Sequence, residues 1–455
     1  SASGHYIRHP KHGLQFTVEN LVEQIPDDVS GLRGYLASGA VAGVGRVTAA
    51  ALIDAFGADV LKVIEAHPER LTEVAGVGAK KAQGIREGWE RSRAVQEIMV
   101  FLSSIGIGPA LSARVYRHFG GERATSSDGI TALIKRLEAN PYLFARVRGI
   151  GFPTADGCAL RMGIGHDSDH RITAGVEYVM GEVVKQGHTL CPVEALIEQS
   201  VDLLEVDATA ISRCIEVVIE RGDLVVGRVN GGRAITLPKI QSAERRIADW
   251  FADRLSPGFY RGPMPYADAT RALAHSTEGL SESQVQSLLR IAGSPVCVLT
   301  GSPGTGKTTL LRAVIHAAEG SKANGRNVRV IACAPTGRAA KRIEEATESK
   351  AATIHRTLEF DPNSGAFARC ASHPLDADFV VVDESSMNDV FLFDALLDAI
   401  PRGAGLLIVG DADQLPSVGP GNVLSDLINS ETAPVARLTE IFRQARGSGI
   451  AMAAR

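Results

Sequence analysis

One eight-residue stretch, GSPGTGKT at residues 301–308, limits the fold of this chain more than any other. It follows the apolar run VCVLT (296–300) and fits the spacing G-x-x-x-x-G-K-[ST] of a phosphate-binding loop. Successive backbone N–H groups of such a loop surround phosphate oxygens, and unpaired N–H groups at the start of the next helix join them. The sequence therefore predicts a strand, a phosphate-binding loop and a helix, in this order.

The side chains of this loop predict its ligand. Lys307 is long enough to reach the β- and γ-phosphate oxygens, and the Thr308 hydroxyl is expected to ligate Mg²⁺. We therefore expect ATP and Mg²⁺ as cofactors. The other loop residues that we expect around ATP are Gly301, Pro303, Gly304, Thr305, Gly306 and Thr309.

Four apolar runs in the last third of the chain predict a parallel sheet. They cover residues 296–300, 328–334, 379–383 and 406–411, and their continuous Val, Ile and Leu content suits strands that are buried on both faces. Each run ends directly in a polar motif. Ligands of open α/β sheets bind beyond the carboxyl ends of the strands, so we expect these four motifs to form one site.

Three further side chains are candidates for that site. We expect Asp383 to hold Mg²⁺ through water and the adjacent Glu384 to orient and deprotonate the attacking water. The alternative is a pair of solvated loop acids. Gln414 follows the fourth run and is expected to hydrogen-bond a γ-phosphate. Gln284, shortly before the first run, is expected to read adenine through its side-chain amide.

The length of 455 residues predicts about three domains, because single cores stop growing well below this size. No apolar stretch is long enough to span a bilayer, and residues 1–16 lack the apolar centre of a signal peptide. None of the six cysteines has C-x-x-C spacing, so we expect reduced thiols in a cytoplasmic protein, without zinc or an iron–sulfur cluster. The net charge of −4 means that a polyanionic partner would have to be bound by local geometry.

The first third of the chain repeats a Gly-apolar-Gly turn followed by a helical pattern. The turns begin at Gly43, Gly76, Gly106 and Gly149, and a short amphipathic stretch precedes each. Glycine allows the positive φ of a tight turn, and the N–H groups that follow form a phosphate site. This pattern resembles tandem helix-hairpin-helix motifs, which bind the sugar-phosphate backbone without reading sequence.

Local charge supports a DNA-binding role for these hairpins. Residues 31–150 carry 16 Lys and Arg against 11 Asp and Glu, and Arg46, Lys80, Lys81 and Arg114 come just after the turns. The alternative is a helical packing array in which the glycines only close turns. The fourth turn, with Gly151, Phe152 and Pro153, offers no nearby cation, which leaves a structural role open for the third and fourth hairpins.

The middle of the chain is less informative. Residues 169–237 combine short helices with two β-rich runs that flank Asn230, Gly231 and Gly232, a good hairpin turn. This order predicts a winged-helix-like domain that contacts DNA, and a spacer is an equally good interpretation. Residues 238–280 are expected to form a helical linker.

Taken together, the motifs of the last third resemble those of superfamily-one DNA helicases, most closely the long-form RecD-like group. The matching segments are Gln284, residues 301–308, APTGRAAKR (334–342), VVVDESSM, GDADQLPSVG and LTEIFRQ (438–444). The hairpins ahead of the motor favour the stand-alone long form. The resemblance implies ATP-driven 5′-to-3′ translocation on single-stranded DNA and duplex unwinding, with single-stranded DNA and strand junctions as partners and a monomeric protein.

The resemblance also implies roles for individual residues. Arg443 in LTEIFRQ would be the arginine that completes the ATP site, and Pro335, Thr336, Arg338, Thr353 and His355 would lie along the single strand. A structural role is the alternative for His355. Residues 359–375 resemble the small 1B pin at the point of strand separation, with an ordinary surface loop as the alternative.

These expectations define a multidomain chain: all-α hairpins, a winged-helix-like middle, then an α/β RecA-like domain with a parallel sheet. We expect a remnant of an N-terminal β-domain or a linker at 1–30, tandem hairpins at 31–168, the winged-helix-like domain at 169–237, and motor domain 1A at 281–436. Residues 437–455 are expected to begin a second RecA-like domain, whose later motifs the chain lacks.

Two alternative functions remain open. One is a DNA-binding module in which the ATPase part acts as a nucleotide-gated clamp without unwinding. The other is a conjugative relaxase-type helicase, which needs a histidine cluster and catalytic tyrosines that the N-terminal third does not contain.

Overall fold

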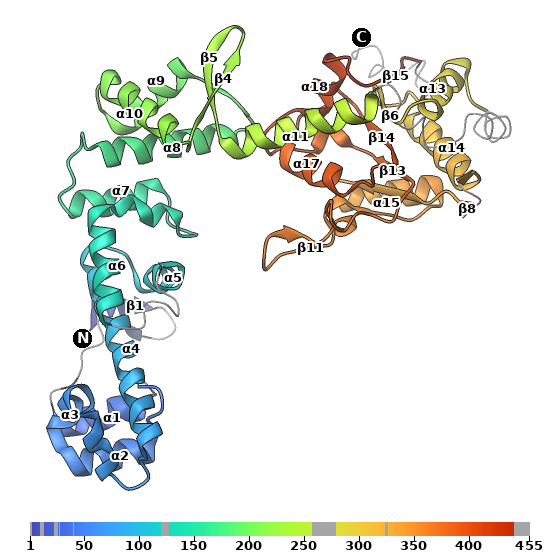
Figure 1. Ribbon diagram of the computed structural model, residues 1–455. Coiled ribbons are helices and arrows are strands. Elements are labelled where there is room, and N and C mark those ends of the chain that lie inside the picture. The colour runs from blue at the N-terminus through green and yellow to red at the C-terminus, as the bar shows by residue number, and fades with distance from the viewer. Residues whose placement is uncertain are drawn as a thin grey trace. The chain divides into compact units, whose positions relative to one another are not determined.

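The computed structural model describes residues 2–9, 13–21, 26, 28–39, 41–119, 127–256, 279–323 and 326–440. The chain divides into two compact units, Ser1–Tyr178 with Val201–Cys214 and Val179–Ser200 with Ile215–Arg455. Figure 1 shows the elements of both units. Among the described residues, no helix is both long and apolar enough to cross a membrane. All six cysteines are free thiols.

The N-terminal unit begins with an antiparallel hairpin, β1 (Ala2–His9) and β2 (Gly13–Leu21). The first two glycine turns then join helical elements around one apolar core that includes Leu36, Leu52, Ile64 and Trp89. These elements are α1 (Val29–Ala37), α2 (Arg46–Phe56), η1 (Gly57–Asp59), α3 (Val60–Ala66), η2 (Pro68–Glu73) and α4 (Ala79–Ser104).

The third and fourth turns lie in the second half of this unit. Its elements are α5 (Pro109–Phe119), α6 (Ser127–Ala139), η3 (Pro141–Arg146) and α7 (Phe152–Arg161). All four predicted turns are present, with φ of +86° at Gly43, +83° at Gly76, +88° at Gly106 and +94° at Gly149. A short 3-10 helix rather than an α-helix precedes the second and fourth turns, where a proline begins the segment.

The predicted winged-helix-like segment contains three helices and a small antiparallel sheet. Its elements are α8 (Asp169–Lys185), β3 (Cys191–Pro192), α9 (Val193–Leu204), α10 (Ala208–Glu220), β4 (Val225–Val229) and β5 (Gly232–Thr236). The strand order is β3-β5-β4, and Asn230 and Gly231 form the predicted turn with φ of +50° and +78°. The winged-helix assignment itself stays a prediction.

A six-stranded, all-parallel sheet forms the centre of the motor part, in the order β10-β9-β13-β14-β6-β15. Four of its strands are the predicted apolar runs: β6 (Val296–Gly301), β9 (Val330–Ala334), β13 (Phe379–Val382) and β14 (Gly405–Gly410). The outer strands β10 (Ala351–Thr353) and β15 (Val435–Leu438) are additional. The fold is therefore RecA-like, with a parallel sheet as expected.

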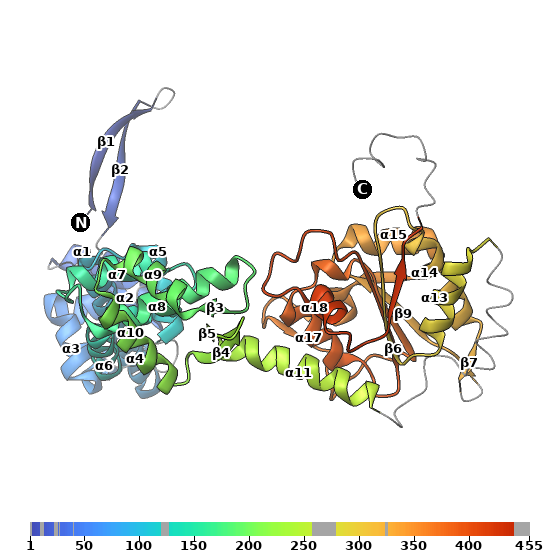
Figure 2. The same cartoon turned by 90° about the horizontal axis from the view of Figure 1, so that it is seen from above.

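Helices cover both faces of this sheet, because alternate residues of each strand enter one of two apolar cores. Val296 and Val298 enter one core with α11 (Pro238–Leu255), α17 (Val390–Ala399) and α18 (Val423–Asn429). Cys297 and Leu299 enter the other with α13 (Glu282–Ala292), α14 (Lys307–Glu319) and α15 (Gly337–Thr347). Figure 2 shows α17 and α18 on one side of β6, and α13 and α14 on the other.

Two predicted boundaries of the motor domain are wrong. Residues 238–255 are helical, as expected, but α11 is not a linker, because Ala243, Ile247 and Phe251 are buried in the core under the sheet. At the other end, β15 pairs in parallel with β6, so residues 437 and 438 belong to the first domain's sheet and do not begin a second domain. Residues 257–278, also predicted to belong to the linker, lie outside the described residues.

Short elements complete the motor part. They are β7 (Lys322–Ala323), β8 (Arg326–Asn327), α16 (Ile354–Thr357), β11 (Phe360–Asp361), β12 (Ala366–Phe367) and η4 (Ser385–Met387). Strands β11 and β12 pair as an antiparallel hairpin within the segment predicted to be a pin, and Gly365 at its tip has a φ of +70°. This hairpin projects from the body of the domain (Figure 1).

Candidate nucleotide site

The glycine-rich loop joins β6 to α14 at the carboxyl edge of the sheet. Gly304 and Gly306 have φ of +88° and +84°, and Gly306 caps α14 without a side-chain hydrogen bond to the first-turn N–H groups. Gly301 has no room for a side chain, because a Cβ would lie 2.6 Å from the Leu438 carbonyl oxygen. Buried Thr305 closes the loop by donating its hydroxyl to the Ser302 carbonyl at 2.8 Å. The N–H groups of the first turn of α14 therefore remain available to an anion.

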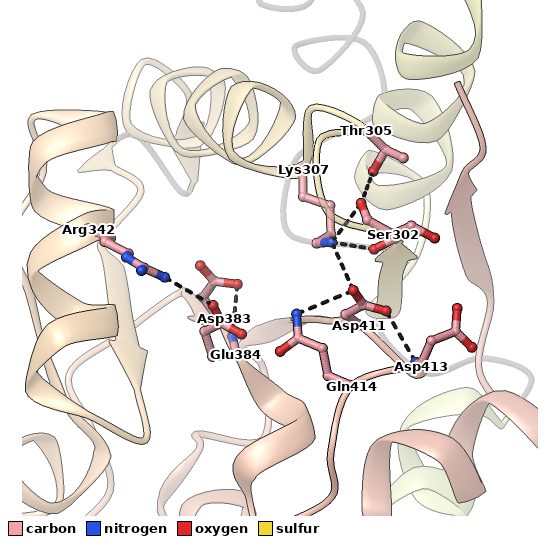
Figure 3. A network of polar contacts seen from close by, with 10 residues as sticks. Ser302, Thr305, Lys307, Arg342, Asp383, Glu384, Asp411, Asp413 and Gln414 are labelled. Atoms are coloured by element: carbon pink, nitrogen blue, oxygen red, sulfur yellow. Dashed lines mark hydrogen bonds and ion pairs between the residues drawn. The ribbon is translucent and has the colours of Figure 1, made fainter. Parts of the chain in front are cut away.

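Lys307 lies at the centre of a polar network (Figure 3). Its Nζ donates to the carbonyl oxygens of Gly301 and Ser302, the latter at 3.3 Å, and lies 3.9 Å from Asp411 Oδ2. Asp411 directly follows β14, the strand next to β6, and its side chain is only 2% exposed. The sheet order thus brings a buried carboxylate to the phosphate-loop lysine.

Asp411 also holds the predicted γ-phosphate sensor. Gln414 donates its side-chain amide to Asp411 Oδ2 at 3.3 Å, and the backbone N–H of Asp413 donates to Asp411 Oδ1 at 3.1 Å. Gln414 therefore lies beside Lys307 through a shared carboxylate, as the strand-end argument expects. Asp411 was not a predicted site residue; its place directly after a buried strand was the signal that could have found it.

Asp383 and Glu384 follow β13, and both residues are half-buried. Asp383 Oδ1 accepts the backbone N–H of Glu384 at 2.8 Å, and Glu384 has a φ of +52°, which is unusual for a residue with a side chain. Burial raises the pKa of Asp383 to about 6; the N–H of Glu384 opposes the rise, the Glu384 carboxylate adds to it, and Lys307 and Arg342 oppose it. A half-buried carboxylate with a raised pKa at a strand end is suited to a divalent cation, which would favour its charged form.

Glu384 faces a cation that the sequence analysis did not single out. Arg342 of α15 places its Nη1 3.7 Å from Glu384 Oε1, and Figure 3 shows the two side chains pointing toward each other. The signal for Arg342 was weak, because its role depends on α15 lying beside the end of β13. The ion pair fixes the direction of the carboxylate that was predicted to act as general base.

Gln284 has a structural role that the adenine hypothesis did not consider. Its backbone N–H donates to Ser281 Oγ at 3.3 Å, and its Oε1 accepts the Ser281 N–H at 3.0 Å, which forms a capping box at the start of α13. The residue is 4% exposed. Adenine recognition by Gln284 stays a prediction, and it would have to share the amide with this cap.

The predicted single-strand contacts gather at the carboxyl ends of β9 and β10, which pair in parallel with Thr353 opposite Ala334. Thr336 and Thr353 cap α15 and α16 by accepting the N–H groups of Ala339 and Arg356, each at 3.2 Å. Pro335 is half-buried and Arg338 is exposed. The structure thus brings these residues together, and their hydroxyl groups also serve as helix caps.

His355 belongs to an aromatic group at the base of the β11–β12 hairpin, the segment predicted to be a pin. Its ring lies 5.3 Å from that of Phe360 and 5.6 Å from that of Phe367, and these two rings are 5.1 Å apart. His355 and Phe360 are exposed. This packing gives His355 a structural function, and its DNA contact stays a prediction.

The four cations that were predicted to bind DNA at the hairpins differ in their surroundings. Arg46 begins α2 and is exposed, as is Lys80 in the first turn of α4. Lys81 joins the first two hairpins by donating to Thr48 Oγ1 at 3.0 Å and to the Gly76 carbonyl at 3.3 Å. Arg114 lies over the fourth turn rather than its own, where it donates to the Arg148 carbonyl at 3.4 Å. Arg443 and its neighbours from residue 441 onward lie outside the described residues.

Comparisons with known protein families also separate the hairpin region from the motor part. A family model for an AAA domain matches residues 284–420, a model for a SAM-like helix-hairpin-helix tandem matches 36–91, and a model for the HHH domain of ATP-dependent RecD2 DNA helicases matches 91–190. An ATP-dependent RecD2 DNA helicase of Deinococcus radiodurans is 32% identical over 98% of this chain. The chain is therefore similar to a RecD2 helicase along almost its whole length.

The chain spans 61% of the length of that RecD2 relative. The RecBCD enzyme subunit RecD of Mycobacterium tuberculosis is 40% identical over 170 residues, which are 32% of this chain and 29% of the relative. A solved structure of Pif1 helicases at forked DNA covers 37% of this chain and 45% of its own, at 23% identity and a TM-score of 0.27. The RecD2 match extends over both the hairpins and the motor part.

Proposed function

We propose that this chain belongs to the RecD2 family and is the DNA-binding and first motor part of an ATP-dependent DNA helicase that moves 5′ to 3′ on single-stranded DNA and unwinds duplexes. The observation that carries the proposal is the meeting of the phosphate loop, Asp383–Glu384 and Asp411–Gln414 at one edge of the sheet. The RecD2 relative is named an ATP-dependent DNA helicase, and the likeness to it includes the hairpins.

The residues present fit ATP and Mg²⁺. The first turn of α14 has no side-chain cap, so its N–H groups suit phosphate oxygens. Thr308 in that turn and the half-buried Asp383 would hold Mg²⁺, which supplies positive charge to the phosphates during transfer. Gly301, Pro303, Gly304, Thr305, Gly306 and Thr309 would surround the nucleotide.

The protein's own groups divide the chemistry of hydrolysis. Lys307 would exchange its loop carbonyls for phosphate oxygens, with Asp411 keeping the ammonium group beside the loop. Glu384, turned by its ion pair with Arg342, would orient the attacking water and accept its proton. Gln414, whose amide bonds to Asp411, would hydrogen-bond the γ-phosphate. Arg443 would contribute an additional positive charge.

DNA would be bound at two places. Pro335, Thr336, Arg338, Thr353 and His355 would follow the single strand along the ends of β9 and β10, and the β11–β12 hairpin would act as a pin at a strand junction. Arg46, Lys80 and Lys81 would bind backbone phosphates at the first hairpins. We further propose a monomeric, cytoplasmic protein without zinc or an iron–sulfur cluster.

The test is the change Lys307→Ala in the full-length parent protein. Loss of the ammonium group removes the charge that would contact the β- and γ-phosphates, so DNA-stimulated ATP turnover should disappear. Retained turnover would contradict the proposal. A strand-displacement assay on a forked substrate with a 5′ tail separates a helicase from a nucleotide-gated clamp, because only a helicase releases the displaced strand.

A further inference from the structure

The third and fourth hairpins each place an arginine at the turn of the other. Arg161 of α7, in the fourth hairpin, donates its Nη1 to the Ile105 carbonyl at the third turn, at 2.9 Å. Arg114 of α5, in the third hairpin, donates its Nη1 to the Arg148 carbonyl at the fourth turn, at 3.4 Å. Each turn thus carries a guanidinium group from the other hairpin. The residues just after the fourth turn, Gly151, Phe152 and Pro153, include no cation, and the fold supplies one from the other hairpin.

The turn glycines make room for these arginines. A Cβ at Gly149 would lie 2.6 Å from Arg114 Nη1, and a Cβ at Gly106 would overlap the guanidinium group of Arg161. Both glycines also have positive φ, which disfavours any residue with a side chain. The two positions therefore serve the turn and the arginine at once.

Further cations gather around the fourth turn. A hollow of about 620 Å³ is lined by Arg114, Arg117, His118, Val147 and Arg148. Arg117 donates its Nε to the Ala113 carbonyl of its own helix at 3.2 Å, and the three arginines are exposed. Among the described residues, none that lines the hollow is acidic. Three guanidinium groups without a carboxylate among them repel one another, so an anion in the hollow would be stabilised.

We propose that this hollow binds a phosphate group of the DNA backbone and gives the chain a second hairpin contact with DNA. Guanidinium groups match phosphate oxygens with paired N–H donors, and the hollow adjoins a glycine turn whose following helix begins without a side-chain cap. The net charge of −4 is no obstacle, because the positive charge is local. This inference rests on the proposed DNA-binding function and adds Arg117, His118 and Arg148 to its residues.

The test compares two triple variants of the 455-residue chain. The first carries Arg114→Gln, Arg117→Gln and Arg148→Gln. The second carries Arg86→Gln, Arg91→Gln and Arg93→Gln on α4, where Arg86 and Arg93 pair with Glu90 and Glu65, and loses the same charge outside the hollow. Fluorescence anisotropy with a duplex oligonucleotide gives the affinity between 50 and about 200 mM salt.

We expect the hollow variant to lose about tenfold in affinity at low salt. The slope of log K against log salt should fall by about 0.9 for each phosphate contact that is lost. The α4 variant should keep the slope. Equal slopes in the wild-type chain and the hollow variant would overturn the inference while leaving the helicase proposal intact, and a wild-type chain that binds no DNA would contradict both.

Two controls keep the result interpretable. Arg114 bonds to a turn carbonyl, so the triple variant could unfold. If thermal unfolding shows this, the single change Arg117→Gln replaces it, because the Arg117 side chain bonds to the Ala113 carbonyl of its own helix. Polyglutamate serves as an anionic protein probe. Unchanged DNA binding together with loss of polyglutamate binding in the hollow variant would assign the hollow to an acidic protein and overturn the proposal.

Discussion

Lys307, which begins α14 after the loop that follows β6, has its Nζ 3.9 Å from Oδ2 of Asp411, which follows the neighbouring strand β14, although 104 positions separate them in the chain. The same Oδ2 accepts the amide of Gln414. One buried carboxylate therefore positions both the phosphate-loop lysine and the predicted γ-phosphate sensor. Asp411 is thus a positioning residue for two groups of the proposed site.

Replacement of Asp411 should disturb both neighbours. Asp411→Asn removes the negative charge opposite Lys307 and weakens the acceptor of the Gln414 amide, so we expect ATP turnover of the full-length parent to fall about 10- to 100-fold, because small misplacements of catalytic groups are costly. Steady-state ATPase kinetics measure the change. Asp413→Asn is the matched control, since Asp413 is exposed and only its backbone N–H meets Asp411. Equal turnover in the two variants would show that Asp411 does not position the site.

The raised pKa of Asp383 predicts that stability depends on pH in the absence of divalent cations. The folded pKa of about 6 exceeds the usual 3.8, so the folded state binds more protons than the unfolded state between these values. The free energy of unfolding then falls as pH rises through this window, and the full loss of stability is present above pH 6.

Asp383→Asn should remove the loss of stability that the charged Asp383 carboxylate causes. In EDTA at pH 7.5, we expect the variant to be more stable than the wild type by on the order of 1–3 kcal/mol, and this advantage should shrink toward pH 4. Denaturant titrations at several pH values measure it. Glu384→Gln is the comparison: it keeps the Asp383 carboxyl and removes only the repulsion from Glu384, so most of the pH dependence should remain. An advantage for Asp383→Asn that does not change with pH would contradict the prediction.

Two glycines of α4 make a matched pair for the first hairpins. A Cβ at Gly88 would lie 2.5 Å from the Ala42 carbonyl oxygen in the first turn, whereas a Cβ at Gly84 would meet nothing within 4 Å. We expect Gly88→Ala to lower the free energy of unfolding by about 1–3 kcal/mol, because the turn must move. Gly84→Ala should raise it by about 0.5–1 kcal/mol, because alanine favours the helix. Denaturant unfolding of both variants measures the difference, and similar values would show that α4 does not hold the first turn closely.

The sequence predicted the parts of the site that are local in the chain. The phosphate loop, the four central strands, the glycine turns and the pin hairpin each depend on a few consecutive residues, and local propensity decides them. It could not predict contacts that depend on strand order or packing. Asp411 meets Lys307 because β14 lies beside β6, and Arg342 meets Glu384 because α15 lies beside β13.

Packing also explains the errors at the domain edges. Helix α11 has apolar residues at 243, 247 and 251, four positions apart, a spacing that predicts a buried face but not the surface that covers it. The four-residue strand β15 is too short for an apolar pattern to distinguish it from a linker. The Arg114 contact with the fourth turn depends on how two hairpins pack, which neither hairpin's residues reveal alone.

The aromatic group at the base of the pin predicts a separation of unwinding from ATP hydrolysis. Phe360 and Phe367 lie on the two pin strands, and both rings pack against His355, which ties the pin to α16. Phe360→Ala removes one ring of this contact without touching the nucleotide residues. In the full-length parent, we expect strand displacement on a forked substrate to fall about tenfold, while ATP turnover stimulated by single-stranded DNA stays within about twofold. Asn363→Ala at the pin tip is the control, because Asn363 bonds to Asp361 of the pin and does not belong to the group of three rings. An equal loss of both activities in Phe360→Ala would assign the aromatic group to the stability of the motor domain instead of the pin.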